Sequence, residues 1–88
     1  MGRIYYPTTA TVVGDHRLRL RFEDGLEGEI DFSDFRRDGL FAVLDDPTYF
    51  RQARIDHEIG ALSWPNGADI APDTLYHWVR EGEHPAAA

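Results

Sequence analysis

The sequence predicts an α+β fold: a single small two-layer domain with the order β-β-β-α-β-β-α, built from antiparallel hairpins and two short helices. Three observations lead to this fold class. The chain has 88 residues, enough for one hydrophobic core but not two. Residues 17–22 and 26–32 alternate between polar and apolar side chains, as half-buried strands do. Pro47 and Pro72 mark two helix starts. We expect the domain to span residues 1–82, with residues 83–88 as a flexible C-terminal tail.

The first three strands follow one another closely. Residues 8–13 are rich in β-branched side chains and lie between Pro7 and Gly14, which predicts a strand. Residues 17–22 and 26–32 then alternate strictly, so each strand has one apolar and one charged face.

The turn between the two alternating strands decides their register. A two-residue turn at Asp24 and Gly25 would place Arg19 opposite Ile30 on the same face, which is inconsistent. A three-residue loop, residues 23–25 with Gly25 left-handed, pairs Leu18 with Ile30. We therefore expect the three-residue loop.

In that register three arginines face three carboxylates across the hairpin: Arg21 with Glu27, Arg19 with Glu29, and Arg17 with Asp31. Such a ladder resembles a binding site. We interpret it as a solvated sheet face whose opposite charges set the register, each pair contributing about 0.2–1 kcal/mol.

The second half predicts a helix, a hairpin and a final helix. Asp46 is a good N-cap for a helix of about two turns that begins at Pro47, with Phe50 facing inward. Residues 54–56 and 61–64 predict a hairpin. Leu75, Trp78 and Val79 share one face of a helix that begins near Pro72 and ends at Gly82. Residues 31–35 read as a strand end that runs into one helical turn, broken by residues 36–39.

Composition excludes several classes of protein. The absence of cysteine removes disulfides, thiolate zinc sites and cysteine nucleophiles, and the absence of lysine removes Schiff-base and P-loop lysine chemistry. The net charge is −7, and residues 45–88 alone carry −5. Because no basic face is present, we expect no direct nucleic-acid binding. We also expect no membrane association and a cytoplasmic location, since no apolar run is long enough for a membrane span.

The search for chemistry yields no catalytic constellation. His16, His57, His77 and His84 have no recognised ligand spacing, and we interpret them as surface residues. Ser33 is expected as a local helix cap and Ser63 as the outward residue of a strand. We therefore predict no catalytic residue, no cofactor and no metal, and expect that the protein is not an enzyme.

One loop, residues 64–70, stands out as a candidate binding site. It places an aromatic ring and polar side chains between a strand and a helix, and such loops often carry binding groups. The candidate residues are Trp64, Asn66, Asp69 and, on the helix that follows, Tyr76. The alternative is structural: Asn66 and Asp69 bond the backbone of the turn while Trp64 lies in the core.

Residues 18–31, 39–47 and 59–76, above all the run from Trp64 to Asp69, resemble the bacterial and phage family DUF2442. The resemblance covers residues 8–80. It implies a fold of three strands, a helix, two strands and a helix, and it implies no assigned activity. Some members resemble the N-terminal part of proteins with a helix-turn-helix domain, for which this chain has no matching segment. Others are encoded beside a small partner in a toxin–antitoxin-like arrangement.

We therefore expect a non-enzymatic protein-interaction module with a basic protein partner, in the form of the antitoxin-like member of a two-protein operon. The alternative is a small-ligand-binding or regulatory domain that uses the loop at residues 64–69. Homo-oligomerisation through an exposed sheet edge is a further alternative.

Overall fold

The computed structural model describes residues 4–33 and 39–82. Its first sheet contains the strands β1 (Pro7–Gly14), β2 (Arg17–Phe22) and β3 (Glu27–Asp31). Its second sheet contains β4 (Arg54–Asp56), β5 (Ala61–Ser63) and β6 (Asp69–Ile70). The helices are the 3-10 helix η1 (Gly39–Asp45) and the α-helices α1 (Pro47–Phe50) and α2 (Pro72–Glu81). The α+β class and the predicted antiparallel hairpins are confirmed; β6 and η1 are added to the predicted order.

The first sheet has the predicted register. Leu18 pairs with Ile30 and Arg19 with Glu29. The amide of Phe22 donates to the carbonyl of Leu26 at 2.8 Å, which closes a loop of three residues. Gly25 has a φ of +94°, a conformation that glycine adopts without strain. The three-residue loop is confirmed.

The predicted charge ladder lies on the solvent side of this sheet, but its ion pairs also run diagonally. Arg19 contacts Glu27 at 2.8 Å, closer than the 3.9 Å to Glu29 directly opposite. Arg17 contacts Asp31 at 3.4 Å. Hydrogen bonds from the hydroxyl and amide of Ser33, assisted by Arg17, lower the pKa of Asp31. Ser33, expected as a helix cap, thus bonds Asp31. The rest of the expected helical turn, Asp34 and Phe35, lies outside the described residues. The expected tail at residues 83–88 lies outside them too.

The second sheet contains a strand that the sequence did not predict. Residues 64–70 were expected to form a loop, but β6 pairs with β5, so that Leu62 lies opposite Ile70. The connection is a tight turn in which the amide of Trp64 donates to the carbonyl of Ala68 at 2.9 Å. Two paired residues are too few to produce an alternating pattern, which explains the error.

The helix that follows Asp46 begins as predicted but is shorter than two turns. The Asp46 carboxylate accepts the amide of Thr48 at 2.9 Å, and Pro47 occupies the first turn. Only Pro47–Phe50 is α-helical, and η1 precedes it. Helix α2 begins at Pro72, and Gly82, with a φ of +68°, caps its C-terminal end, as predicted. Among the described residues no helix is long and apolar enough to cross a membrane.

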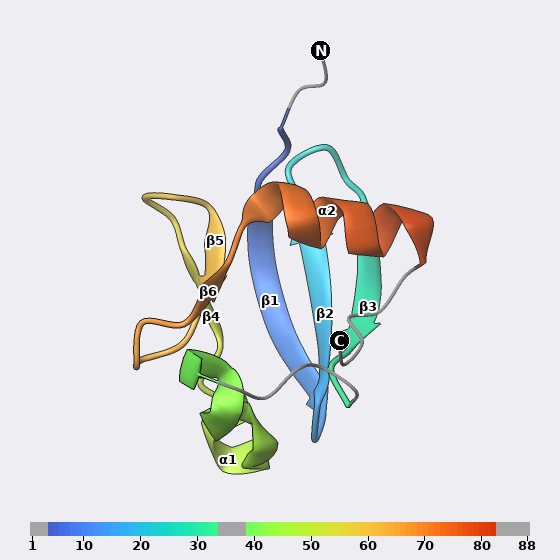
Figure 1. Ribbon diagram of the computed structural model, residues 1–88. Helices are drawn as coiled ribbons and strands as arrows, with labels where there is room; N and C mark the ends of the chain where they lie inside the picture. Colours follow the sequence, from blue (N-terminus) through green and yellow to red (C-terminus); the bar gives the residue numbers. More distant parts are fainter. Residues whose placement is uncertain (1–3, 34–38, 83–88) are drawn as a thin grey trace.

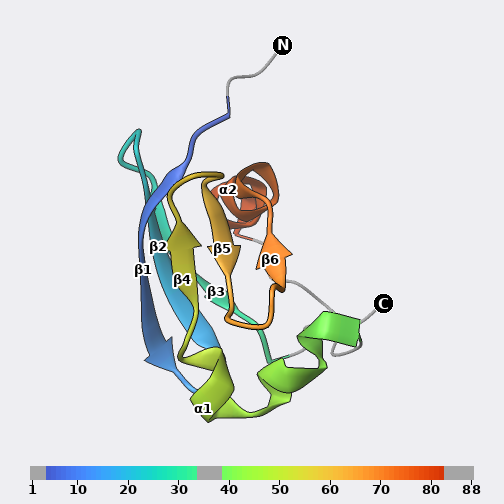
Figure 2. The ribbon, with the colours of Figure 1, turned by 90° about the vertical axis from the view of Figure 1, so that its left-hand side faces the viewer.

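The core lies between the first sheet and α2, with the second sheet closing one side (Figures 1 and 2). Strand β4 lies beside β1, and β6 leads directly into α2. Helix α2 packs closely on β3, because a Cβ at Gly28 would lie 2.9 Å from Cγ1 of Val79. The largest fully buried side chains come from both sheets and all three helices: Leu18, Leu20, Phe22, Ile30, Phe32, Leu44, Phe50, Leu62, Trp64 and Leu75.

Candidate functional site

The four sequence-predicted site residues do not share one surface. Trp64 is only 2% exposed, and its Nε1 donates to the carbonyl oxygen of Phe50 at 3.1 Å. The side-chain oxygen of Asn66 accepts the amide of Ala68 within the turn. Asp69 is exposed on β6. Tyr76 lies on α2, where it contacts a different part of the chain. The ring of Trp64 therefore packs in the core.

Tyr76 is held by an aromatic cluster at the end of the first sheet. Its ring stacks on Tyr5, with centroids 5.2 Å apart and an interplanar angle of 28°. It also meets the buried Phe22 edge to face at 5.0 Å. The Tyr76 hydroxyl donates to Asp24 in the β2–β3 loop at 2.6 Å, and this bond, together with desolvation and the Asp24 charge, raises the pKa of Tyr76. The cluster thus ties α2 to the N-terminal segment and the hairpin loop.

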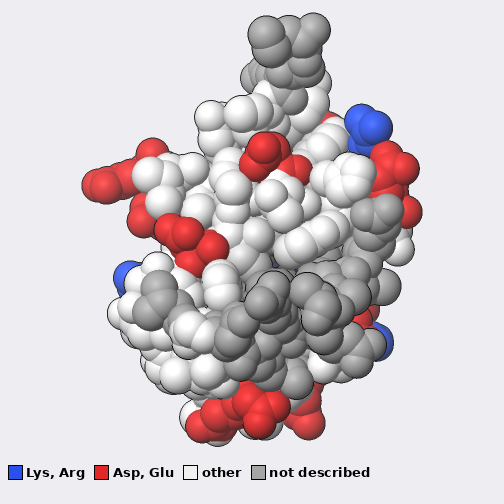
Figure 3. Space-filling model, viewed as in Figure 1, with Lys and Arg blue, Asp and Glu red and all other residues white. Residues whose placement is uncertain are grey.

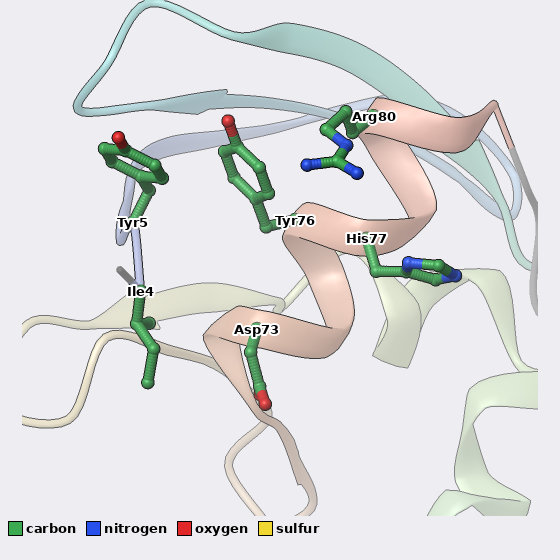
Figure 4. A pocket seen from close by; sticks show the side chains of 6 residues that line it. All are labelled: Ile4, Tyr5, Asp73, Tyr76, His77 and Arg80. Carbon is green, nitrogen blue, oxygen red and sulfur yellow. The ribbon is translucent and has the colours of Figure 1, made fainter. Parts of the chain in front are cut away.

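A hollow of about 150 Å³ borders the tyrosine pair (Figure 4). The Arg80 side chain lies on the opposite side of Tyr76 from Tyr5, and His77 points away from the pair. The hollow is lined by Ile4, Tyr5, Asp73, Tyr76, His77 and Arg80.

The N-terminal segment, residues 4–7, leads into β1 and is held by contacts with the β2–β3 loop on one side and with Gly60 on the other. The amide of Tyr6 donates to the Glu23 carboxylate at 3.1 Å, and the amide of Glu23 donates to the Tyr6 carbonyl at 3.0 Å. The Tyr6 ring lies against Gly60, where an added Cβ would overlap the ring. Gly60 also has a φ of +69°, so two constraints favour glycine there.

A second hollow, of about 480 Å³, lies on the Tyr6 side of the segment. It is lined by Tyr6, Pro7, His57, Glu58, Ile59 and Gly60. The segment at residues 4–7 therefore separates two hollows, one bordered by α2 and the other by the β4–β5 turn.

Large apolar side chains are exposed around these hollows. Ile59 is 52% exposed, Ile4 47% and Tyr6 45%, while the other exposed large apolar residues of the described chain, Val13 and Val43, line neither hollow. We call the set Ile4, Tyr5, Tyr6, Ile59 and Tyr76 the N-terminal surface. Sequence reasoning missed it, although two signals were available: the Ile-Tyr-Tyr run before Pro7, and an isoleucine inside a turn.

The charged groups next to the N-terminal surface are mostly acidic. Glu23 and Asp24 approach it from the hairpin loop, Glu58 from the β4–β5 turn and Asp73 from α2. Arg80 is the arginine among the residues that line the two hollows. Figure 3 shows acidic groups around a largely uncharged area on the α2 side of the molecule. The local charge therefore favours a positively charged ligand.

The other polar residues considered in the sequence are the histidines and Ser63. His16 was expected at the surface, but it is half-buried, and its Nε2 lies 2.8 Å from the carbonyl oxygen of Leu44. His57 and His77 are exposed as expected, and Ser63 is half-buried; His84 lies outside the described residues. Within residues 4–33 and 39–82, no group of three or more His, Asp or Glu side chains is arranged to hold a metal ion.

Comparison with known protein families gives the following match. Residues 7–81 match the model of a family described as "Protein of unknown function (DUF2442)". No curated protein and no solved structure matches the chain.

Proposed function

Because the chain belongs to the DUF2442 family, whose description names no activity, we propose from its surface that it is a non-enzymatic module that binds a protein partner. The observation that supports this function is the exposure of Ile4, Tyr6 and Ile59 beside two hollows. Apolar side chains gathered on the surface of a small domain are typical of interaction sites. Aromatic residues are enriched in such sites because a tyrosine contributes a large contact area at low entropic cost.

The chemistry of the partner follows from charge. The net charge of the chain is −7, and Glu23, Asp24, Glu58 and Asp73 surround the N-terminal surface. Opposite charges speed association and select partners, so we propose a partner segment that combines apolar and basic side chains. The same acidity disfavours nucleic acid, whose phosphates need basic contacts.

An antitoxin-like role, the form of partner binding that the family resemblance implies, fits this proposal: an acidic module would cover a basic partner in a two-protein system. We propose that this interaction takes place in the cytoplasm.

The experiment is affinity capture of the full chain from a lysate of its native host at low salt. Wild type should retain a basic protein, and Ile59→Arg should lose it because a cation then projects from the acidic, apolar surface. Val13→Arg is the matched control, since Val13 is 45% exposed and borders neither hollow. Recovery of no protein partner, or equal recovery by Ile59→Arg, would contradict the proposal.

Binding of a small ligand is a second candidate, supported by the hollow beside Tyr76. Its walls offer two tyrosine rings and the Arg80 guanidinium, groups that contact planar or anionic ligands. A thermal-shift screen of nucleotides and metabolites tests this function. A rise in the melting midpoint that Arg80→Ala removes would support it, and an unchanged midpoint with every compound would count against it.

A further inference from the structure

The outer edge of β3 carries backbone groups that residues 4–33 and 39–82 leave without a hydrogen bond. Phe22 bonds Leu26 across the hairpin, and Phe32 bonds His16 at 2.6 Å at its other end. Opposed residues of an antiparallel pair alternate between bonded and non-bonded. The even-numbered residues of β3 therefore face β2, and the N–H and C=O of Glu27 and Glu29 point outward. No hydrogen bond from the described residues reaches those outward groups.

The side chains along this edge have an ordered charge pattern. Across the solvent side of the sheet, Thr11 on β1 lies opposite Arg19 on β2, and Arg19 lies opposite Glu29 on β3. The side chains on this side of the sheet are thus neutral on β1, basic on β2 and acidic on β3. In the described part of the chain, the arginines that contact Glu27 and Glu29 lie on β2, and the two glutamate side chains stay 39% and 42% exposed. An added strand with basic side chains opposite Glu27 and Glu29 would continue this pattern.

The other side of the sheet is covered beyond β3 by the helix. Helix α2 crosses the first sheet, and its C-terminal end extends past β3 (Figure 1). Gly28 brings Val79 of α2 close to β3, and Trp78 packs edge to face on Phe32 at 6.2 Å. Apolar side chains of an added strand would lie beneath this part of the helix, while its alternate side chains would meet Glu27 and Glu29.

We infer that β3 accepts an additional strand from a partner whose residues alternate between basic and apolar side chains. Strand addition obtains affinity from backbone hydrogen bonds and specificity from alternate side chains. A second copy of this chain is not the occupant, because pairing β3 with β3 brings the acidic side chains together. Glu27 and Glu29 therefore repel a second copy and attract a basic strand. This site is separate from the N-terminal surface of the proposed function.

The test uses the full chain, labelled with ¹⁵N, and a capped hexapeptide of alternating arginine and valine. The amide signals of Glu27 and Glu29 should shift on titration and become protected from hydrogen exchange. A peptide with glutamate in place of arginine is the control and should not bind. Replacing both carboxylates, with Glu27→Gln and Glu29→Gln together, should weaken binding about tenfold.

The role of the backbone is tested on the peptide, so that it does not depend on a folded variant. N-methylation of the peptide residues whose N–H groups face β3 should weaken binding about tenfold, since the methyl group removes the donors. N-methylation of the alternate residues should leave affinity unchanged. Equal effects of the two methylated peptides would overturn the inference. So would shifts confined to Ile4, Tyr6 and Ile59, which would instead support the proposed function, or the absence of any shift.

Discussion

The indole Nε1 of Trp64 donates a hydrogen bond to the carbonyl oxygen of Phe50 at 3.1 Å in the interior of the molecule. The two rings also pack, with centroids 6.0 Å apart. Phe50 ends α1, and Trp64 follows β5, so this contact joins the short helix to the second sheet. Trp64, for which the sequence left a binding and a structural role open, is thus a structural link.

Replacing Trp64 by phenylalanine should destabilise the fold. Trp64→Phe removes the indole donor from a buried carbonyl and leaves unfilled volume, for a loss of about 2–4 kcal/mol in the free energy of unfolding. Urea denaturation followed by circular dichroism measures it. Val13→Ala, at an exposed site, is the control and should change little. An unchanged midpoint for Trp64→Phe would contradict the structural role.

The left-handed backbone of Gly25 predicts an order of stability among variants at this position. With a φ of +94°, Gly25→Val should lower the free energy of unfolding by about 1–2 kcal/mol, because a β-branched residue resists positive φ. Gly25→Asn should lose less, since asparagine tolerates this region better than other side chains. Denaturant midpoints of the three proteins give the order. A valine variant as stable as wild type would exclude the turn described above.

The close approach of Gly28 to Val79 predicts that substitutions at these two positions have non-additive effects on stability. Gly28→Ala places a methyl group 2.9 Å from Val79 Cγ1, and such overpacking should cost about 1–3 kcal/mol. Adding Val79→Ala should recover part of that loss, because the smaller side chain leaves room for the new methyl group. A double-mutant cycle measures the coupling, and simple additivity of the two changes would show that the contact is not as close as described.

The Tyr76–Asp24 hydrogen bond predicts a dependence of stability on alkaline pH. The pKa of Tyr76 is raised in the folded state, chiefly because its hydroxyl donates to Asp24. The folded protein therefore holds this proton more tightly than the unfolded chain. The resulting stabilisation is fully present below the ordinary tyrosine pKa of about 10 and is lost as the pH rises through the folded-state value.

Chemical denaturation between pH 8 and about pH 11.5 tests this dependence. Wild type should lose more stability over that range than Tyr76→Phe, which has no proton to release. Parallel curves for the two proteins would show that the hydrogen bond contributes nothing to the linkage.

The elements that could be predicted from sequence are those with a strong local signal. The alternation over residues 17–32 determined the register of β2 and β3, and Asp46, Pro47, Pro72 and Gly82 marked helix boundaries at the right positions. In each case the physical cause lies within a few neighbouring residues. Local patterns therefore carried most of the architecture.

The features that escaped prediction depend on contacts between distant parts of the chain. Tyr5 and Tyr76 lie at opposite ends of the sequence, and only the packing of α2 on the first sheet brings them together. The half-buried position of His16 depends on the carbonyl of Leu44. Strand β6 exists because its two residues pair with β5. None of these contacts leaves a periodic trace in the sequence.

Helix α2 is the last described element, yet it covers the apolar side of the first sheet. A ribosome makes the three strands of that sheet long before it makes the helix. During this interval Leu18, Leu20 and Ile30 lack their cover, and nascent chains are prone to aggregation at such times. A polypeptide that stops before Pro72 should accordingly bind chaperones or precipitate, whereas a chain that includes α2 buries the same side chains.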